Sequence, residues 1–493
     1  MHFGRERFAP LAGMALAAVA LNACHPASRS PADTRAATLR VGFGQVSSEG
    51  FGALARNLAV ENLARLGDDG RPQPVLALNW TASPDGRVLT VTLRPNVKFH
   101  DGSPLTADIV AAALTVTLPN AMGPAASDLE SVTALGSQQV VIRLRRPTPF
   151  LLDSLEAGVP KPGSPLMGTG PFAVSDPNSP GELRASADYY GGRPEIDRVV
   201  MQSFPSVRAA WAEMLRNRLD MLYEVGTDAL DSLETSKQIT VFTFIRRYQY
   251  VIVLNPKTET LRSPGVRRAL NVAIDRDALI RDALNGHGVA SNGLVWLHHY
   301  ALGKNSPTFQ FDLRSAAAAL DRSSASAPAH KLRFTCLVPA DPVAERIALV
   351  VQRQLNDVGI EMAVEQASMD QIMAAIRTQR FEAAFAQVIS GPSLLRPYQM
   401  WHSKGFFNMN NPAIDTALDR VRYADSDDAY RGAVTSFQQA MVDDPPAIFL
   451  AWIEQARAVS KRFVVPQAEA GRDILSTLRL WKPADNKRQS SQN

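Results

Sequence analysis

One cysteine near the start of the chain stands in a pattern that can be lipidated. Cys24 follows Leu21-Asn22-Ala23, and an apolar stretch at residues 8–21 precedes it after Arg5 and Arg7. A small residue before such a cysteine allows a signal peptidase to cut there, and the thiol can then carry a diacylglycerol. The stretch is short for a membrane-spanning helix, so we expect a cleaved signal peptide and a lipid-anchored chain outside the cytoplasmic membrane, on its periplasmic side.

No other group of residues in the sequence forms a reactive pattern. The chain lacks a nucleophile elbow, a Ser-x-x-Lys and a His-Glu-x-x-His motif. Cys336 lies in an apolar stretch that reads as a buried strand, where a thiol is inert. Its histidines lack the spacing of metal ligands, because His298 and His299 are adjacent and point differently in any regular element. We therefore expect no catalytic residue, metal site or cofactor.

The bulk properties restrict the class of protein further. Acidic and basic residues nearly balance, with a formal net charge of +4, and no basic run is interleaved with aromatic residues. Nucleic acid is therefore a poor candidate partner. After cleavage about 470 residues would remain, enough for two or three domains. Residues 24–37 are rich in Pro, Ser and Ala, which favours a flexible tether.

Hydrophobic periodicity predicts strands that alternate with helices. Strands are expected at residues 38–43, 89–93, 97–100 and 248–254, and a helix at 53–66. Residues 332–364 read as a strand, a helix and a second strand, with Gly359 ending the helix. This alternation indicates an α/β protein of more than one lobe.

One long stretch carries a distinctive order of motifs. Residues 78–108 join Trp80, the turn Asp85-Gly86, and Phe99-His100 followed by a second turn at Asp101-Gly102. Further stretches at residues 168–172, 189–197, 266–276 and 355–361 fit the same pattern. In these residues the chain resembles the extracytoplasmic solute-binding proteins of ABC importers, family 5, which take up oligopeptides, dipeptides and nickel complexes. The motifs themselves are expected to be scaffold, since His100 and Asp101 stand at a tight turn.

The resemblance implies an α/β, two-lobed periplasmic-binding-protein fold of class II type, with an extra subdomain in the first lobe. Hinge closure would trap the ligand, with crossing strands near Asn255 and Ala456 taking up the rotation. The implied division of the chain is a signal peptide at 1–23, a tether at 24–37, lobe I at 38–77, the extra subdomain at 78–163, lobe I again at 164–261, lobe II at 262–455, a return to lobe I at 456–485 and a tail at 486–493.

Ligand contacts are also placed by the resemblance. They fall in the loop after the first strand, near Trp296, in residues 390–401, and around residues 408–410. The expected contacts are Gln45, Val46, Trp296, His298, Ser390, Arg396, Tyr398, Trp401, Asn408 and Asn410.

The sequence departs from its relatives at one of these places. Many peptide-binding members carry an acidic residue in the stretch corresponding to residues 388–392, where it pairs with the ligand's α-ammonium group. Here no acid occurs between Glu382 and Asp415, and Arg396 is the only charge near that position. A buried ammonium group without a counter-charge would be unfavourable. The ligand is therefore expected either to lack a free amino terminus or to present an anionic group to Arg396.

The expected function is that of a monomeric, lipid-anchored binding component that captures a peptide or peptide-like solute and delivers it to ABC permease subunits. A nickel complex held through its chelator is an alternative ligand. An alternative function is that of a lipoprotein that signals ligand binding to a membrane receptor. A further alternative, from a different class of protein, is an extracytoplasmic hydrolase on the same fold.

Overall fold

The computed structural model describes residues 37–44, 50–226, 230, 233, 235–324, 332–468 and 472–484. The predicted lipidation site Cys24 and the signal peptide lie outside these residues. So do Gln45 and Val46, two of the predicted ligand contacts.

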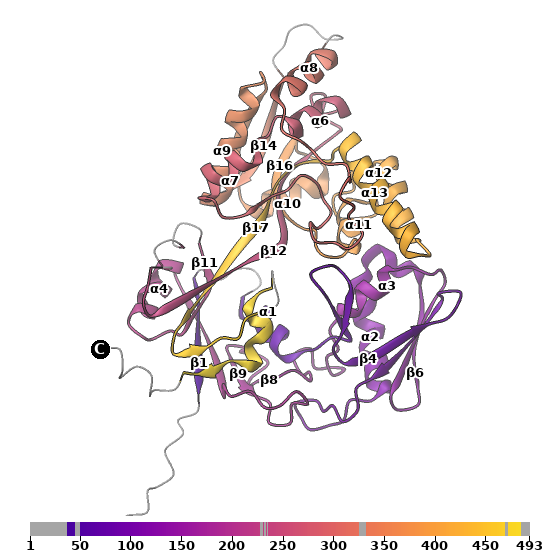
Figure 1. The fold of residues 1–493 in the computed structure, drawn as a ribbon, viewed down its shortest axis with the longest axis vertical. Coiled ribbons are helices and arrows are strands. Elements are labelled where there is room, and N and C mark those ends of the chain that lie inside the picture. The colour runs from indigo at the N-terminus through magenta and orange to yellow at the C-terminus, as the bar shows by residue number, and fades with distance from the viewer. Residues whose placement is uncertain are drawn as a thin grey trace, which may run out of the picture. The chain divides into compact units, whose positions relative to one another are not determined.

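Two long antiparallel strands run through the main sheet. β12 (Ile239–Leu254) and β17 (Ala447–Ser460) lie side by side along most of their length (Figure 1). Within the described residues the sheet has eleven strands, in the order β15-β14-β16-β12-β17-β11-β1-β10-β9-β8, with β13 paired to β17 outside this path. β12 and β17 are therefore the only strands of this sheet that connect its two parts. We call the part on the β11 side lobe I and the part on the β16 side lobe II.

Lobe I is built around β1, which pairs in parallel with β10 and β11. Alternating apolar residues of β1, Leu39 and Val41, are fully buried in its core. The helix α4 connects β10 to β11, as a parallel crossover requires. The elements of this part are β1 (Thr38–Gly44), α1 (Gly50–Ala59), β8 (Phe172–Val174), β9 (Glu182–Ala185), β10 (Arg198–Phe204), α4 (Val207–Leu215), β11 (Met221–Val225), β18 (Phe463–Val464), the 3₁₀ helix η4 (Ile474–Leu480) and β19 (Lys482–Pro483).

Lobe II contains the predicted strand-helix-strand unit. β14 and β15 pair in parallel on either side of α9 in the chain, and Gly359 after the helix has a positive φ of 80°. Cys336 on β14 is fully buried, and burial raises the pKa of its thiol to about 12. The elements are α6 (Pro264–Val272), α7 (Arg276–Leu284), β13 (Val289–Ala290), α8 (Leu313–Ser324), β14 (Arg333–Pro339), α9 (Pro342–Asn356), β15 (Glu361–Ala367), α10 (Met369–Thr378), β16 (Ala383–Ile389), α11 (Leu395–Trp401), α12 (Pro412–Arg422) and α13 (Asp427–Asp443).

A separate four-stranded antiparallel sheet, in the order β4-β5-β7-β6, forms the extra subdomain. Its strand β5 alternates buried with partly buried residues, and α2 packs against β6 and β7. Residues Ala107–Asp128 are long and apolar enough to cross a membrane by length and composition, but their buried side chains belong to the core of this subdomain. The elements here are β2 (Ala64–Leu66), β3 (Pro72–Pro74), β4 (Ala77–Ala82), β5 (Val88–Leu93), α2 (Ala107–Met122), the 3₁₀ helix η1 (Gly123–Asp128), β6 (Leu129–Leu135), β7 (Gln139–Leu144), α3 (Phe150–Asp153) and the 3₁₀ helix η2 (Ser154–Glu156).

Two sequence-based expectations about elements were wrong. The helix predicted at 53–66 ends at Ala59, and β2 follows it. Residues 97–100 form no strand and have one isolated bridge, Lys98 to Pro104, because the chain reverses at Asp101-Gly102 before a ladder can extend. The strand predicted at 248–254 is confirmed, but it is longer and begins at Ile239, since pairing with β17 holds polar residues in the sheet that periodicity alone did not assign to it.

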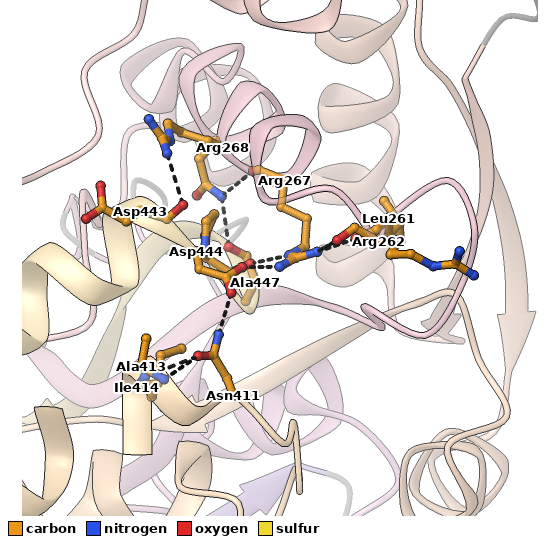
Figure 2. Close-up of polar contacts among 12 residues, drawn as sticks. Leu261, Arg262, Arg267, Arg268, Asn411, Ala413, Ile414, Asp443, Asp444 and Ala447 are labelled. Atoms are coloured by element: carbon orange, nitrogen blue, oxygen red, sulfur yellow. Dashed lines mark hydrogen bonds and ion pairs between the residues drawn. The ribbon is translucent and has the colours of Figure 1, made fainter. Parts of the chain in front are cut away.

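A buried arginine fastens the end of α13 to the helix α6 (Figure 2). Arg267 is 3% exposed and forms an ion pair with Asp444, and its Nε donates to the carbonyl of Pro445 at 3.0 Å. The other carboxylate oxygen of Asp444 accepts a bond of 2.7 Å from the Asn411 amide, whose own oxygen caps α12. These bonds fix the chain just before β17 begins at Ala447.

We predict that Arg267→Met lowers the free energy of unfolding by about 3–5 kcal/mol, because it leaves the Asp444 carboxylate and several carbonyl groups without their partner. The neighbouring Arg268 is exposed on the same helix and donates to the Asp443 carbonyl at 3.1 Å, so Arg268→Met should change stability by about 0.5 kcal/mol or less. Urea denaturation followed by circular dichroism measures both variants. Equal losses in the two variants would contradict the role given to Arg267.

Candidate functional site

A cavity of about 370 Å³ opens beside β11 of lobe I, where β12 and β17 pass between the lobes. Its floor comes from lobe I and the crossing strands, and one wall comes from Trp296 of lobe II. The lining residues are Asn57, Asp68, Tyr223, Glu224, Phe244, Ile245, Arg246, Arg247, Tyr248, Trp296, Gln455, Arg457, Arg472, Asp473 and Ser476.

Two irregularities in the sheet place side chains in this cavity. In β11, Tyr223 and Glu224 both stand opposite Arg457 of β17, between the pairs Leu222 with Ala458 and Val225 with Ala456. A bulge of this kind bends a strand and redirects its side chains, and bulges are common beside functional sites.

The second irregularity lies on the other side of β17. Three residues of β12, Arg246 to Tyr248, stand opposite the single residue Ile453, between the pairs Ile245 with Glu454 and Gln249 with Trp452. The backbone of Arg247 is turned toward lobe II, where its carbonyl accepts a bond of 2.9 Å from the Ser390 amide. Both neighbours of β17 are therefore irregular where the cavity lies.

The floor of the cavity is a buried cation surrounded by aromatic rings. Arg457 is 4% exposed and forms two hydrogen bonds with the Asp473 carboxylate, at 3.3 and 2.7 Å. Its guanidinium group lies 3.9 Å from the centre of the Tyr223 ring, which in turn stacks on Phe43. Burial raises the pKa of the Tyr223 hydroxyl, so this group stays neutral at physiological pH. The arginine and its carboxylate partner neutralise each other within the floor.

The other charged side chains that line the cavity form different hydrogen bonds and ion pairs. Arg247 pairs with Glu156 at 3.2 Å and donates to the carbonyl of Leu66 at 3.0 Å. Arg472 donates to the same carbonyl at 2.6 Å. Asp68 pairs with His298 of lobe II. These bonds link the cavity wall to β2 and to the extra subdomain.

A loop of lobe II covers the cavity by contacting lobe I directly. The indole nitrogen of Trp296 donates to the carbonyl of Asp68 at 2.8 Å, and the amide of Tyr300 donates to the carbonyl of Asp69 at 2.9 Å. The Trp296 ring packs edge-on against Trp452 and lies so close to Gly391 that a Cβ there would come within 2.5 Å of it. Glycine is therefore required at position 391 for the tryptophan to take its place.

The second lobe also contacts the extra subdomain through a buried ion pair. Arg422 of α12 and Asp128 of η1 are 3% and 6% exposed, and the two groups are 2.6 Å apart. The same guanidinium group donates to the hydroxyl of Tyr398 and to that of Ser127. An isolated buried charge is unfavourable, so each partner depends on the lobes being in contact.

The predicted ligand contacts are therefore distributed over several places. Trp296 lines the cavity, and His298 pairs with Asp68 at its rim. Ser390 is 1% exposed and directs its hydroxyl toward the Val388 carbonyl at 3.5 Å, although its amide reaches Arg247. Tyr398 and Trp401 are buried in the lobe II core, outside the cavity lining.

The remaining predicted contacts lie farther along lobe II. Arg396 donates to the side-chain oxygen of Gln399 at 2.9 Å, and Gln399 in turn donates to the Ala121 carbonyl at the end of α2. Asn408 and Asn410 are exposed and have positive φ angles of 47° and 52°, which are turn conformations before the capped start of α12. None of these three residues lines the cavity. Their contribution to ligand binding stays a prediction.

The residues that do line the cavity from β11, β12 and β17 were not identified from the sequence. Tyr223, Glu224 and Arg246 lie in stretches where apolar periodicity is interrupted, because bulges break the alternation that marks a strand. The cluster Arg246-Arg247-Tyr248, directly before the apolar strand, was the one available signal.

A larger hollow, of about 530 Å³, lies at the outer edge of lobe II between β14, β15 and α10. Its charged lining residues are Glu365, Arg380 and Glu382, and all of its lining comes from lobe II. The carboxylate of Glu382 already accepts a hydrogen bond of 2.6 Å from the backbone amide of Thr335. Because residues of a single lobe line this hollow, whereas both lobes line the cavity at the connecting strands, that cavity is the better candidate. Within the described residues, no group of three or more His, Cys, Asp or Glu side chains could hold a metal ion.

The comparison with known families agrees with a site between two lobes. The model of the bacterial extracellular solute-binding proteins, family 5 Middle, matches residues 71–408. The chain belongs to this family. The resemblance predicted from residues 78–108 is thereby confirmed.

Individual relatives of this solute-binding protein cover most of its length. Protein XP55 of Streptomyces lividans is 27% identical over 452 residues, or 84% of this chain and 82% of the relative. The oligopeptide-binding protein AppA of Bacillus subtilis is 23% identical over 444 residues, or 80% of this chain and 81% of the relative. NikZ from Campylobacter jejuni, solved in complex with Ni(L-His), matches 90% of this chain and 99% of its own with a TM-score of 0.77 and 19% identity. The predicted two-lobed α/β fold is confirmed; the exact boundaries of its parts stay a prediction.

One buried carboxyl group makes the contact between the lobes of the solute-binding protein sensitive to pH. Asp153, at the end of α3, accepts a bond of 2.5 Å from the hydroxyl of Ser393 in lobe II. Burial raises the pKa of this carboxyl group to about 7, against the lowering effect of the Ser393 bond. Between pH 4 and 7 the folded protein therefore binds a proton that the unfolded chain has released, and stability falls as the pH rises through this range.

We predict that Asp153→Asn removes much of this pH dependence. The parent should lose free energy of unfolding between pH 4 and pH 8, and the loss should be smaller in the variant by about 2 kcal/mol. Urea titrations at a series of pH values measure the difference. Asp428→Asn, at an exposed position of α13, is the control and should follow the parent. A variant with the same pH profile as the parent would contradict the assignment to Asp153.

Proposed function

We propose that this protein is the lipid-anchored binding component of an ABC importer, which captures a peptide or peptide-like solute between its lobes and delivers it to permease subunits in the membrane. The observation that carries the proposal is the cavity between the lobes, which both lobes line at the two strands that connect them. A ligand there would touch groups from both lobes at once, so its binding free energy would favour the closed arrangement.

The connecting strands supply a place for the hinge. Between Ile245 and Gln249 the ladder of β12 and β17 is interrupted, so fewer backbone bonds resist rotation there than elsewhere in the sheet. Ala456, one of the two predicted hinge positions, lies in β17 close to this interruption, whereas Asn255 lies past the end of β12 and donates to the Phe381 carbonyl within lobe II. The proposed hinge is therefore centred on residues 246–248 of β12 and 453–456 of β17.

The lobe contacts would serve as the closed-state contacts of this motion. Trp296 and Tyr300 bond backbone carbonyls of Asp68 and Asp69, which water can satisfy equally in an open form. The Arg422–Asp128 ion pair would also become hydrated on opening. The buried Arg422–Asp128 pair and the apolar contact of Phe150 with Tyr398 would favour the closed arrangement, because opening separates the two charges and exposes both rings to water.

We expect the purified protein to hold one small molecule in this cavity and to release it unaltered. Gln455→Trp, which places a large ring on the cavity floor, should abolish the bound mass, whereas Leu135→Trp at an exposed position of β6 should retain it. Native mass spectrometry after a circular dichroism check of folding measures both. A bound molecule that is chemically altered over time would refute the assignment as a binding protein.

We expect Cys24→Ser to release the protein from the membrane, because the thiol is the proposed site of the diacylglycerol. The parent should enter the membrane fraction and the detergent phase on phase separation, and the variant should remain in the aqueous fraction. Ser28→Ala, in the same tether, is the control and should behave like the parent. A variant that still fractionates with the membrane would exclude this anchor.

A further inference from the structure

Two charged groups of opposite sign in the cavity remain available to a ligand. Among the lining arginines, Arg457, Arg247 and Arg472 all bond to the protein's own carboxylates or carbonyls. Arg246 differs, since its guanidinium group contacts the ring of Tyr248 at 4.5 Å and, within the described residues, has no ion pair within 4 Å.

Glu224 is the corresponding acid. Its carboxylate accepts a single bond of 2.9 Å, from the side-chain amide of Gln455, and forms no ion pair within the described part of the chain. The other lining acids are matched, since Asp473 pairs with Arg457 and Asp68 pairs with His298. Both Glu224 and Arg246 are partly buried, so a charge at either is less well hydrated than one on the surface. Glu224 also feels the positive charge of Arg457, whose guanidinium group is hydrogen-bonded to Asp473.

The sheet holds these two groups on opposite sides of the cavity floor. Glu224 belongs to the bulge of β11 and Arg246 to the bulge of β12, and β17 lies between these strands. Both residues line the same cavity, so a ligand lying across β17 would have a cationic group on one side and an anionic group on the other. Within the described part of the chain, no ion pair joins the two groups.

Aromatic side chains line part of this cavity. Phe244 and Tyr248 lie on the same strand as Arg246, and Trp296 comes from lobe II, whereas β17 between the two charges contributes Gln455 and Arg457. The cavity volume of about 370 Å³ is near the lower end of the roughly 300–1,000 Å³ of small-molecule sites. A small ligand with two charged ends fits this lining.

We propose that the solute is a small zwitterion, of the size of an amino acid or a dipeptide, whose ammonium group binds Glu224 and whose carboxylate binds Arg246. This inference rests on the proposed binding function and deepens it. It also replaces the expectation, drawn from the missing acid in residues 383–414, that the ligand either lacks a free amino terminus or presents an anionic group to Arg396. The counter-charge for the ammonium group comes from lobe I, on a strand that the sequence did not identify.

The test varies the charged ends of the ligand and the charged residues of the protein together. Alanyl-X dipeptides are prepared in four forms: free, N-acetylated, C-amidated, and capped at both ends. An equimolar mixture of each form is offered to protein from which bound ligand has been removed. Native mass spectrometry selects the bound member, and titration calorimetry gives its affinity. We expect the free form to bind the parent about 10- to 100-fold more tightly than either singly capped form.

Variants then assign each end to a residue. Glu224→Gln should weaken the free form by about 10- to 100-fold and leave the affinity for the N-acetylated form almost unchanged. Arg246→Gln should weaken binding of the free form to the same extent and leave the affinity for the C-amidated form almost unchanged. Arg246→Lys should restore part of the affinity for the free form. Glu454→Gln, whose carboxylate pairs with His287, is the matched control and should resemble the parent. Arg396→Gln tests the competing contact that was predicted from the sequence.

The other possible results distinguish failure of the zwitterion proposal from failure of the proposed binding function. If both capped forms bind the parent as tightly as the free form, or if Arg396→Gln alone removes the preference for a carboxylate, the zwitterion proposal is wrong. The same holds if the parent binds none of the four mixtures but retains another small molecule on purification. If the purified protein neither retains nor binds any solute, the proposed function itself fails.

Discussion

The pairing of β12 with β17 is the constraint on which the rest of this structure depends. Both strands start in one lobe and end in the other, and within the described residues they are the only strands that join the two parts of the main sheet. Each lobe has its own buried core against these strands, with Val459 in the lobe I cluster and Ile448 and Leu450 in a lobe II cluster. Any change in the relation of the lobes must therefore deform this pair, and the ladder is interrupted where deformation is easiest.

The same interruption produces the chemistry of the cavity. A regular strand would alternate its side chains between the faces of the sheet and would send only some of Arg246, Arg247 and Tyr248 to the cavity. The irregular ladder brings all three to its lining, and the bulge in β11 does the same for Tyr223 and Glu224. In the proposed function, the hinge and the ligand-binding residues would therefore share one structural origin, and binding at the cavity would be coupled to closure directly.

Polar groups buried away from the cavity have a different role, because they hold each lobe together as a body. Arg267 joins α6 to the residues before β17, and Arg276 of α7 donates to the carbonyls of Ser291 and Phe449. Burial lowers the pKa of Arg276 to about 10, which still leaves it charged at physiological pH. The contacts between lobe II and the extra subdomain combine buried polar pairs with an apolar contact of Phe150 with Tyr398. In the proposed hinge closure each lobe would move as a rigid body, and opening would break these contacts.

The sequence by itself determined the family, the α/β character and the helices and strands whose apolar residues are regularly spaced. Residues 78–108 carried the resemblance because tight turns such as Asp85-Gly86 and Asp101-Gly102 need particular residues, and local requirements of this kind are visible in a single sequence. The unit β14-α9-β15 was predicted for the same reason, since its apolar residues recur regularly and Gly359 marks the end of the helix.

Only the tertiary structure decided which residues face the cavity. Glu224 and Arg246 are brought there by bulges whose positions follow from the register against β17, a strand more than 200 residues away in the chain. Conversely, Tyr398 and Trp401 were predicted as contacts but pack in the lobe II core, because burial depends on long-range packing that a local pattern does not encode.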